Sequence, residues 1–311
     1  MTINVGFQMD PIEGLNLKQD TTLAIITECL SKSFNVFHFL PKNVSYTDGE
    51  VNAYCRKVLE INESNSPFYK LGVLEKTNLR NMDIIFVRQD PPFDMSYITS
   101  TFLLEYIEDD VSIINKPSKI RNCPEKLFLN KWKHLTPKTL ISRNYESLLN
   151  FRETYKNIIV KPLYGNGGNG VFYIKENDKN FNSVVETFLE RSSEPFIFQE
   201  YIKDIKKGDK RIILFNGEPV GAINRIPSKN DIRANLHVGG VPEKTYLTKK
   251  ESEICIEIGP SLVKNGLVFA GIDVIGEKLT EINVTSPTGF REIFQFNGVN
   301  LAKKLLNIVL K

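Results

Sequence analysis

The chain has 311 residues, of which 41% are hydrophobic, and its 40 Lys and Arg against 37 Asp and Glu give a formal charge of +3. This composition is typical of a globular protein and excludes an intrinsically disordered one. A chain of this length usually builds more than one hydrophobic core, so two or three packed subdomains are expected. No apolar run reaches the roughly 18 residues that a membrane helix needs, and no targeting segment is recognisable. A cytoplasmic protein without a membrane partner is therefore expected.

The charged residues and cysteines exclude several further classes of function. Acids interrupt the Lys and Arg runs, so no basic stripe indicates a nucleic-acid partner. The four cysteines form no CxxC pair and share no metal-ligand spacing with the three histidines. Zinc sites and disulfide frameworks are not expected.

Strand and helix patterns alternate in the first third of the chain. Apolar alternation at 3–7 and at 34–40, with a helical spacing between them, predicts a βαβ unit. The short apolar run at 83–87 predicts a parallel strand buried on both faces. We expect the next helix to be capped at Ser96. Together these patterns predict a mixed α/β chain that opens with a Rossmann-like open sheet, whose polar strand ends are where ligands bind.

After Pro117 the pattern changes to shorter strands and antiparallel pairing. Asn216 and Gly217 lie between two apolar runs and predict a tight hairpin. Thr248 and Glu251 form a capping box that predicts the start of a helix, and Gly266 predicts its end. Four further strands and two helices are expected at 139–142, 158–161, 171–174 and 196–199, and at 145–156 and 181–191.

A glycine-rich segment has the spacing G-x-G-x-x-G, formed by Gly165, Gly167, Gly168 and Gly170. In a dinucleotide site a helix follows this motif, but here a β-branched and aromatic run follows. We therefore interpret the glycines as a flap between two strands, whose free N–H groups can lie over phosphates. The upstream cation Lys161 favours a polyphosphate ligand. The alternative is a loop that only requires positive φ angles.

Three oxygen-bearing side chains occur in two successive strand patterns near the C-terminus. Strand alternation places Glu281 and Asn283 on one face, and Asp273 points away from its apolar neighbours on the preceding strand. If 273 and 281 pair directly, the three side chains form a cluster that suits Mg²⁺ bridging nucleotide phosphates. An exposed polar face of a hairpin is the alternative.

Three arginines lie between the glycine segment and this hairpin, namely Arg211, Arg225 and Arg233. Their guanidinium groups match carboxylates and phosphates. Singly, each would be interpreted as a surface residue, and only their position favours a site. The turn at 286–288 follows the acidic strand and either offers hydroxyl and N–H groups or is a plain connector.

Segments along nearly the whole chain closely resemble bacterial glutathione synthetases. The glycine segment is shared by many ATP-grasp ligases, but two of the segments, beginning at Arg88 and at Glu281, are together specific. The matching segments are Met9-Asp-Pro-Ile12, Arg88-Gln-Asp-Pro-Pro-Phe-Asp94, Asn115-Lys-Pro117, Glu125-Lys-Leu-Phe128, Val160-Lys-Pro162, Gly165-Asn-Gly-Gly168, Gly208-Asp-Lys-Arg211, Arg225-Ile-Pro227 and Glu281-Ile-Asn-Val-Thr-Ser-Pro-Thr288.

The resemblance implies an ATP-grasp fold with an N-terminal domain at 1–121 and an ATP-grasp domain at 122–311. The latter would comprise a lid subdomain at about 122–200 and a C-terminal subdomain at about 201–311, with ATP between them. The implied cofactor is a pair of Mg²⁺ ions, with Mn²⁺ as an alternative. The family also implies a homo-oligomer, typically a tetramer.

The resemblance assigns roles to residues at matching positions. It implies phosphate contacts by Lys126, Lys161 and the four glycines, and an adenine pocket formed by Gln199, Glu200, Tyr201 and Ile202, with Asp209 near the ribose. It implies metal ligation by Asp273, Glu281 and Asn283. It implies substrate and acyl-phosphate contacts by the catalytic Arg211, Arg225 and Arg233 and by Ser286, Pro287 and Thr288.

The implied reaction joins γ-glutamylcysteine to glycine through an acyl phosphate made with ATP, giving glutathione, ADP and phosphate. Water must be kept from that intermediate, so the glycine flap and the loop at 226–241 are the expected lids. That loop has few apolar anchors and is expected to be mobile without substrate. The chain departs from the family in the segment from Arg233 to Gly240 and in having Gly289 where a cysteine often stands. Another ATP-grasp ligase with a different acceptor therefore stays open, as does a nucleotide-binding regulator.

Overall fold

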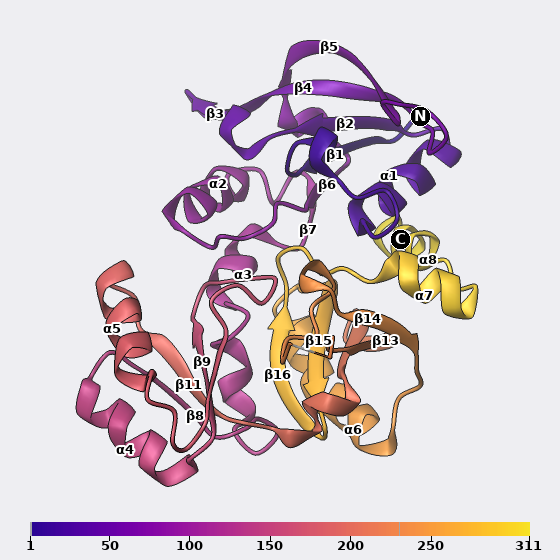
Figure 1. The fold of residues 1–311 in the computed structure, drawn as a ribbon. Coiled ribbons are helices and arrows are strands. Elements are labelled where there is room, and N and C mark those ends of the chain that lie inside the picture. The colour runs from indigo at the N-terminus through magenta and orange to yellow at the C-terminus, as the bar shows by residue number, and fades with distance from the viewer. Residues whose placement is uncertain (1, 230) are drawn as a thin grey trace.

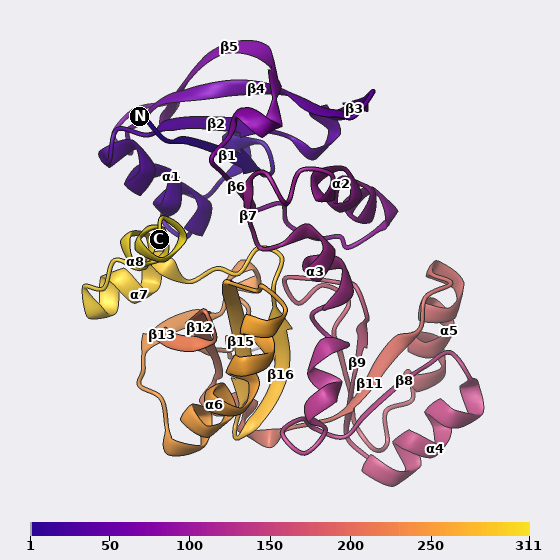
Figure 2. The same ribbon diagram turned by 180° about the vertical axis from the view of Figure 1, so that it is seen from behind.

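The computed structural model describes residues 2–229 and 231–311, and of His237 only the backbone. Three sheets form in this part of the chain, with seven, four and five strands. Figures 1 and 2 show the first sheet at one end of the molecule and the other two beside each other at the opposite end.

The first sheet has a parallel core in the order β2-β1-β6-β7, which confirms the predicted βαβ start. Every residue of β6 is buried, as its apolar run predicts. The helix cap predicted at Ser96 is wrong: the side chain of Asp94, two residues earlier, accepts from the backbone N–H of Tyr97 at 2.9 Å. The elements are β1 (Asn4–Gln8), α1 (Thr21–Ser31), β2 (Asn35–Phe39), β6 (Ile84–Val87), α2 (Met95–Glu105), β7 (Ser112–Ile114) and α3 (Pro117–Asn122).

An antiparallel extension widens this sheet beyond the open parallel arrangement that the sequence predicts. The extension comprises β3 (Val44–Thr47), β4 (Glu50–Ile61) and β5 (Tyr69–Asn78), and β4 pairs with β2 in the register Val36 to Val58. No residue of β5 is buried. A strand without a buried face needs no apolar alternation, which is the pattern that predicts a strand from sequence.

The second sheet has the order β10-β9-β11-β8. Leu148 from α4 and Val185 from α5 share its core with Val160 and Phe198, so these helices pack on the sheet. β9 and β10 pair antiparallel, which confirms that the glycine segment joins two strands. The elements are β8 (Thr139–Ser142), α4 (Tyr145–Tyr155), β9 (Ile158–Pro162), β10 (Phe172–Ile174), α5 (Phe181–Arg191) and β11 (Phe196–Glu200).

The third sheet is antiparallel, in the order β14-β13-β12-β15-β16. The predicted hairpin is present, and Asn216 and Gly217 both have positive φ angles, as a type I′ turn requires. The capping box of Thr248 and Glu251 opens α6. The elements are β12 (Asp209–Phe215), β13 (Glu218–Ile226), β14 (Val241–Lys244), α6 (Lys249–Lys264), β15 (Phe269–Ile275) and β16 (Lys278–Asn283).

Two C-terminal helices, α7 (Phe290–Asn297) and α8 (Leu301–Val309), return to the first sheet. Figures 1 and 2 both show them beside α1, and Leu305 and Leu306 share a buried cluster with Ile25 and Ile26. The sequence analysis did not predict these helices. In the described residues, no helix combines the length and apolar character needed to cross a membrane.

Candidate active site

A cleft between the second and third sheets extends to the first sheet and gathers most of the predicted site residues. Of the residues assigned from the sequence, only Gly170 and Pro287 are not part of its lining. A methyl group at Gly170 would face the Pro162 ring at 3.3 Å, and the Cβ of Pro287 lies 3.0 Å from a methyl group built on Gly271. Both residues therefore support the cleft walls from behind.

The β15–β16 hairpin supplies the oxygen-bearing side chains in the register that the alternation predicts. Asp273 pairs directly with Glu281, and Gly271 pairs with Asn283. The Asn283 side chain donates to Gly271 O at 3.2 Å and to Asp273 Oδ2 at 3.3 Å, which leaves its own oxygen available. The side chain of Glu281 is 22% exposed and faces the cleft.

Two arginines hold the carboxylate of Asp273. Arg211 donates to both oxygens, at 2.5 and 2.9 Å, and Arg225 Nη2 lies 3.0 Å from Oδ1. Burial opposes ionisation of this group, but the two guanidinium charges outweigh burial and hold the pKa of Asp273 well below its usual range. Asp273 is therefore a permanent anion in the floor of the cleft.

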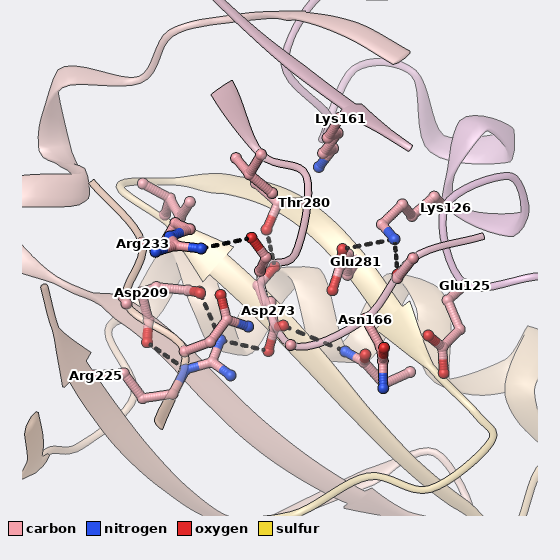
Figure 3. Close-up of a pocket in the computed structure, with 18 of the residues that line it drawn as sticks. Glu125, Lys126, Lys161, Asn166, Asp209, Arg225, Arg233, Asp273, Thr280 and Glu281 are labelled. Atoms are coloured by element: carbon pink, nitrogen blue, oxygen red, sulfur yellow. Dashed lines mark hydrogen bonds and ion pairs between the residues drawn. The ribbon is translucent and has the colours of Figure 1, made fainter. Parts of the chain in front are cut away.

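Asp209 completes this buried network from the adjacent strand. Arg225 Nη2 donates to its Oδ2 at 2.5 Å, and Figure 3 shows both side chains beside Asp273. Burial raises the pKa of Asp209 to about 7, although Arg225 opposes the shift. Within the described residues its Oδ1 is buried without a hydrogen-bond partner.

Two lysines lie on the opposite side of the cleft. Lys126 Nζ lies 3.6 Å from Glu281 Oε1 and also donates to the carbonyl of Gly165 in the flap. Lys161 is the penultimate residue of β9 and points toward the acidic hairpin, as Figure 3 shows. Burial lowers the pKa of Lys161, and the nearby Glu281 opposes that shift. In the described residues Lys161 forms no ion pair, so its buried amine is well placed to bind a phosphate.

The glycine flap and the loop after β13 contact each other. Arg233 donates to Asp231 Oδ2 at 2.7 Å and to Gly168 O at 3.2 Å. Gly168 has a φ angle of +80°, and a methyl group there would lie 2.8 Å from Asn235 Oδ1, so this contact requires glycine. Ala234, which is 2% exposed, is one buried apolar anchor of this loop.

The turn after β16 is fixed by the first sheet. Arg88 Nη2 donates to Pro287 O at 3.0 Å, and the hydroxyl of Ser286 donates to Arg88 O at 3.3 Å. Glu125 accepts from the hydroxyl of Thr285 at 2.7 Å and from the backbone N–H groups of Val284 and Thr285. The sequence analysis gave neither Arg88 nor Glu125 a role, although both stand in segments that carry the resemblance.

Gln199, Glu200 and Tyr201, at and just after the end of β11, line another part of the cleft. Tyr173 and Tyr201 stack with their ring centroids 4.2 Å apart. Gln199 donates to Thr139 Oγ1 at 3.0 Å, and Glu200 accepts from the N–H of Lys138 at 3.0 Å. Tyr173 is absent from the predicted set, because its place opposite Tyr201 depends on the pairing of strands.

Two family models match successive parts of the chain. Residues 3–121 match the family model "Prokaryotic glutathione synthetase, N-terminal domain", and residues 125–298 match its "ATP-grasp domain". The glutathione synthetase of Agrobacterium fabrum is 48% identical over 99% of this chain and 96% of its own length. That of Brucella melitensis is 49% identical over 97% of this chain and 96% of its own length.

Solved structures with much lower identity share the fold. A D-cycloserine synthetase, DcsG, is 11% identical with a TM-score of 0.68 and is matched over 98% of this chain and 99% of its own. The ATP-grasp ligase PsnB, complexed with a precursor variant, Mg and ADP, is 14% identical with a TM-score of 0.61 over 100% and 98% of the two chains. Together with the full-length relatives and the family models, they show that this chain is an ATP-grasp ligase of the prokaryotic glutathione synthetase family.

Proposed function

We propose that this chain joins γ-glutamylcysteine to glycine at the expense of ATP, through an acyl phosphate on the cysteinyl carboxylate. The observation that carries the proposal is the cleft itself. It sets Lys126, Lys161 and three arginines around a pair of carboxylates, and the two covers of the cleft, the glycine flap and the loop after β13, contact each other there. Such a site brings phosphates and a carboxylate together without a covalent protein nucleophile.

The residues present fit a magnesium site. Asp273, Glu281 and the free oxygen of Asn283 are hard donors, and a carboxylate can accept from arginine and still offer a lone pair to a cation. In the described residues no third carboxylate, histidine or cysteine joins the two acids, so the amide completes the set. Held by these residues, Mg²⁺ would offset the negative charge of the transferred phosphoryl group.

The chain's own groups then divide the work. Lys126 and Lys161 hold the phosphates, while the flap N–H groups lie above them. Arg211 and Arg225, fixed by Asp273 and Asp209, present positive charge to the carboxylate that is phosphorylated. Arg233 closes the cover, so glycine attacks the acyl phosphate in a site that excludes water.

The proposal also covers the nucleotide pocket, the domain boundaries, the assembly and the location of the protein. The adenine ring would lie by Tyr201 and Gln199, with the ribose near Asp209. The N-terminal domain would end at about residue 121, with the lid and C-terminal subdomains dividing near residue 200. The chain would assemble as a tetramer, and it would act in the cytoplasm.

Product analysis tests the proposal. Purified protein with ATP, Mg²⁺, γ-glutamylcysteine and glycine should yield glutathione and ADP, identified by mass spectrometry. Glu281→Gln should reduce turnover by at least about 100-fold because a metal-facing charge is lost, while its thermal unfolding stays near that of the wild type. Normal turnover of this variant at saturating Mg²⁺ would contradict the assignment, and product with another amine in place of glycine would favour the alternative acceptor.

A further inference from the structure

Asp90 is an acidic residue of the cleft that has no role in the proposed mechanism. Asp90 follows β6 and lines the cleft with Pro91, and Ser286 and Thr288 line the cleft as well. Its segment is already joined to that turn through Arg88, whose side chain donates to Pro287 O. Asp90 therefore lies where the first sheet meets the substrate end of the cleft.

The other acids that line the cleft are engaged. Glu125 accepts from the hydroxyl of Thr285, and Glu200 accepts from the N–H of Lys138. The other three acids form ion pairs: Asp209 with Arg225, Asp273 with both Arg211 and Arg225, and Glu281 with Lys126. Within the described residues, the carboxylate of Asp90 forms no hydrogen bond and no ion pair, and the residue is exposed.

The backbone nevertheless holds Asp90 in place. Its N–H donates to Asp10 Oδ2 at 2.8 Å, and the N–H of Arg88 donates to Gln8 O at 2.7 Å. Two prolines follow, and their rings fix the φ angles of the segment. A carboxylate on a stiff segment loses less entropy on binding than one on a free surface loop, so the arrangement is typical of a preorganised contact.

The chemistry of the substrate identifies what this carboxylate would bind. Two lysines and three arginines line the rest of the cleft and suit phosphates and carboxylates, and its other acids already have partners. The dipeptide also carries an α-ammonium group on its γ-glutamyl residue, which needs an anionic acceptor. Resting on the proposed function, we propose that the Asp90 carboxylate binds this ammonium group and selects γ-glutamyl dipeptides.

Glycine also carries an ammonium group, but its amine must lose a proton before it attacks. A fixed carboxylate stabilises the charged form of an amine, which strengthens binding of the γ-glutamyl end and would oppose attack by glycine. The dipeptide is therefore the better match to Asp90.

The test compares γ-glutamylcysteine with N-glutarylcysteine, which lacks only the ammonium group. The wild type should prefer γ-glutamylcysteine by about 10- to 100-fold in kcat/KM, the range of a charge-assisted hydrogen bond. Asp90→Asn should remove most of this preference while the KM values for ATP and glycine stay within about twofold. Asp109→Asn, an exposed acid away from the cleft, is the matched control and should retain the preference.

Two results would overturn the inference. One is an unchanged preference in a correctly folded Asp90→Asn variant. The other is a raised KM for glycine with the dipeptide preference intact, which would place Asp90 at the acceptor. Calorimetric binding of the two dipeptides gives the same comparison without turnover, so a wild type that binds γ-glutamylcysteine selectively but forms no glutathione would count against the proposed function alone.

Discussion

Charged side chains in the floor of the cleft stabilise one another as well as the site. Arg211, Asp273 and Arg225 are each at most 6% exposed, and removing one would leave an uncompensated buried charge. Truncating either arginine therefore combines a folding defect with a catalytic one. Glu281 lies at the edge of this network and is more exposed, so its variants separate the two effects.

The four cysteines are free thiols that the fold shields from solvent. All are buried, and burial raises the pKa of Cys29 and Cys255 to about 12 and that of Cys55 to about 11. Because the thiolate is the reactive form, the folded chain should not form mixed disulfides with its thiol substrate. A disulfide reagent such as DTNB should modify none of them between pH 7 and 9, and about four after denaturation.

The sign of the pH effect follows from these raised values. Above the ordinary thiol pKa of about 8.5 the unfolded thiols ionise while the folded ones stay protonated, so the free energy of unfolding should fall as the pH rises further. Rapid modification of a thiol in the native protein at pH 8 would show that at least one cysteine is accessible.

At the scale of elements, the sequence predicts structure where one local pattern decides it. Alternation places Asp273 opposite Glu281. The β-branched and aromatic run after Gly170 indicates that the glycine segment joins two strands and is not a dinucleotide motif, and β9 and β10 do pair on either side of it. The β3–β5 extension has an exposed edge strand with weak alternation, and α7 and α8 bury their apolar faces against α1, which is distant in sequence. The contacts of Arg88 and Tyr173 likewise depend on which segments meet, and no local pattern contains that information.

The contact between the two covers of the cleft supports a prediction about coupling. Arg233→Ala removes the hydrogen bond to Gly168 O and should let water reach the acyl phosphate. Phosphate released per glutathione formed should rise above about one, the stoichiometry of a single phosphoryl transfer. Lys229→Ala, an exposed residue of the same loop, should keep the ratio near one. A ratio near one in both variants would make Arg233 a binding contact only.

At the scale of the whole molecule, both ends of the chain build the same core. Asn115, in the segment after β7, donates to Phe269 O at 2.7 Å and to Val284 O at 2.9 Å, so the first sheet is joined directly to the third. Thr21, at the start of α1, accepts from the N–H of Gly289 at 3.2 Å. The turn at 286–288 therefore lies between these two connections, one to the segment after β7 and one to α1. Its position depends on how the C-terminal helices pack against α1.

Because α8 and α1 share a buried cluster, we expect a substitution that destabilises α8 to destabilise α1 as well. Leu305 is fully buried in the cluster that α8 shares with α1, so Leu305→Ala should lower the free energy of unfolding by about 2–5 kcal/mol. Leu310→Ala is the matched control, because Leu310 is 39% exposed and its loss should cost about 0.5 kcal/mol or less. Hydrogen exchange of the native protein should show faster exchange of α1 amides in Leu305→Ala, since opening of α8 uncovers Ile25 and Ile26. Normal α1 protection in a variant that is destabilised overall would show that the C-terminal helices open independently of the first sheet, and the turn at 286–288 would then be positioned by Arg88 and Thr21 alone.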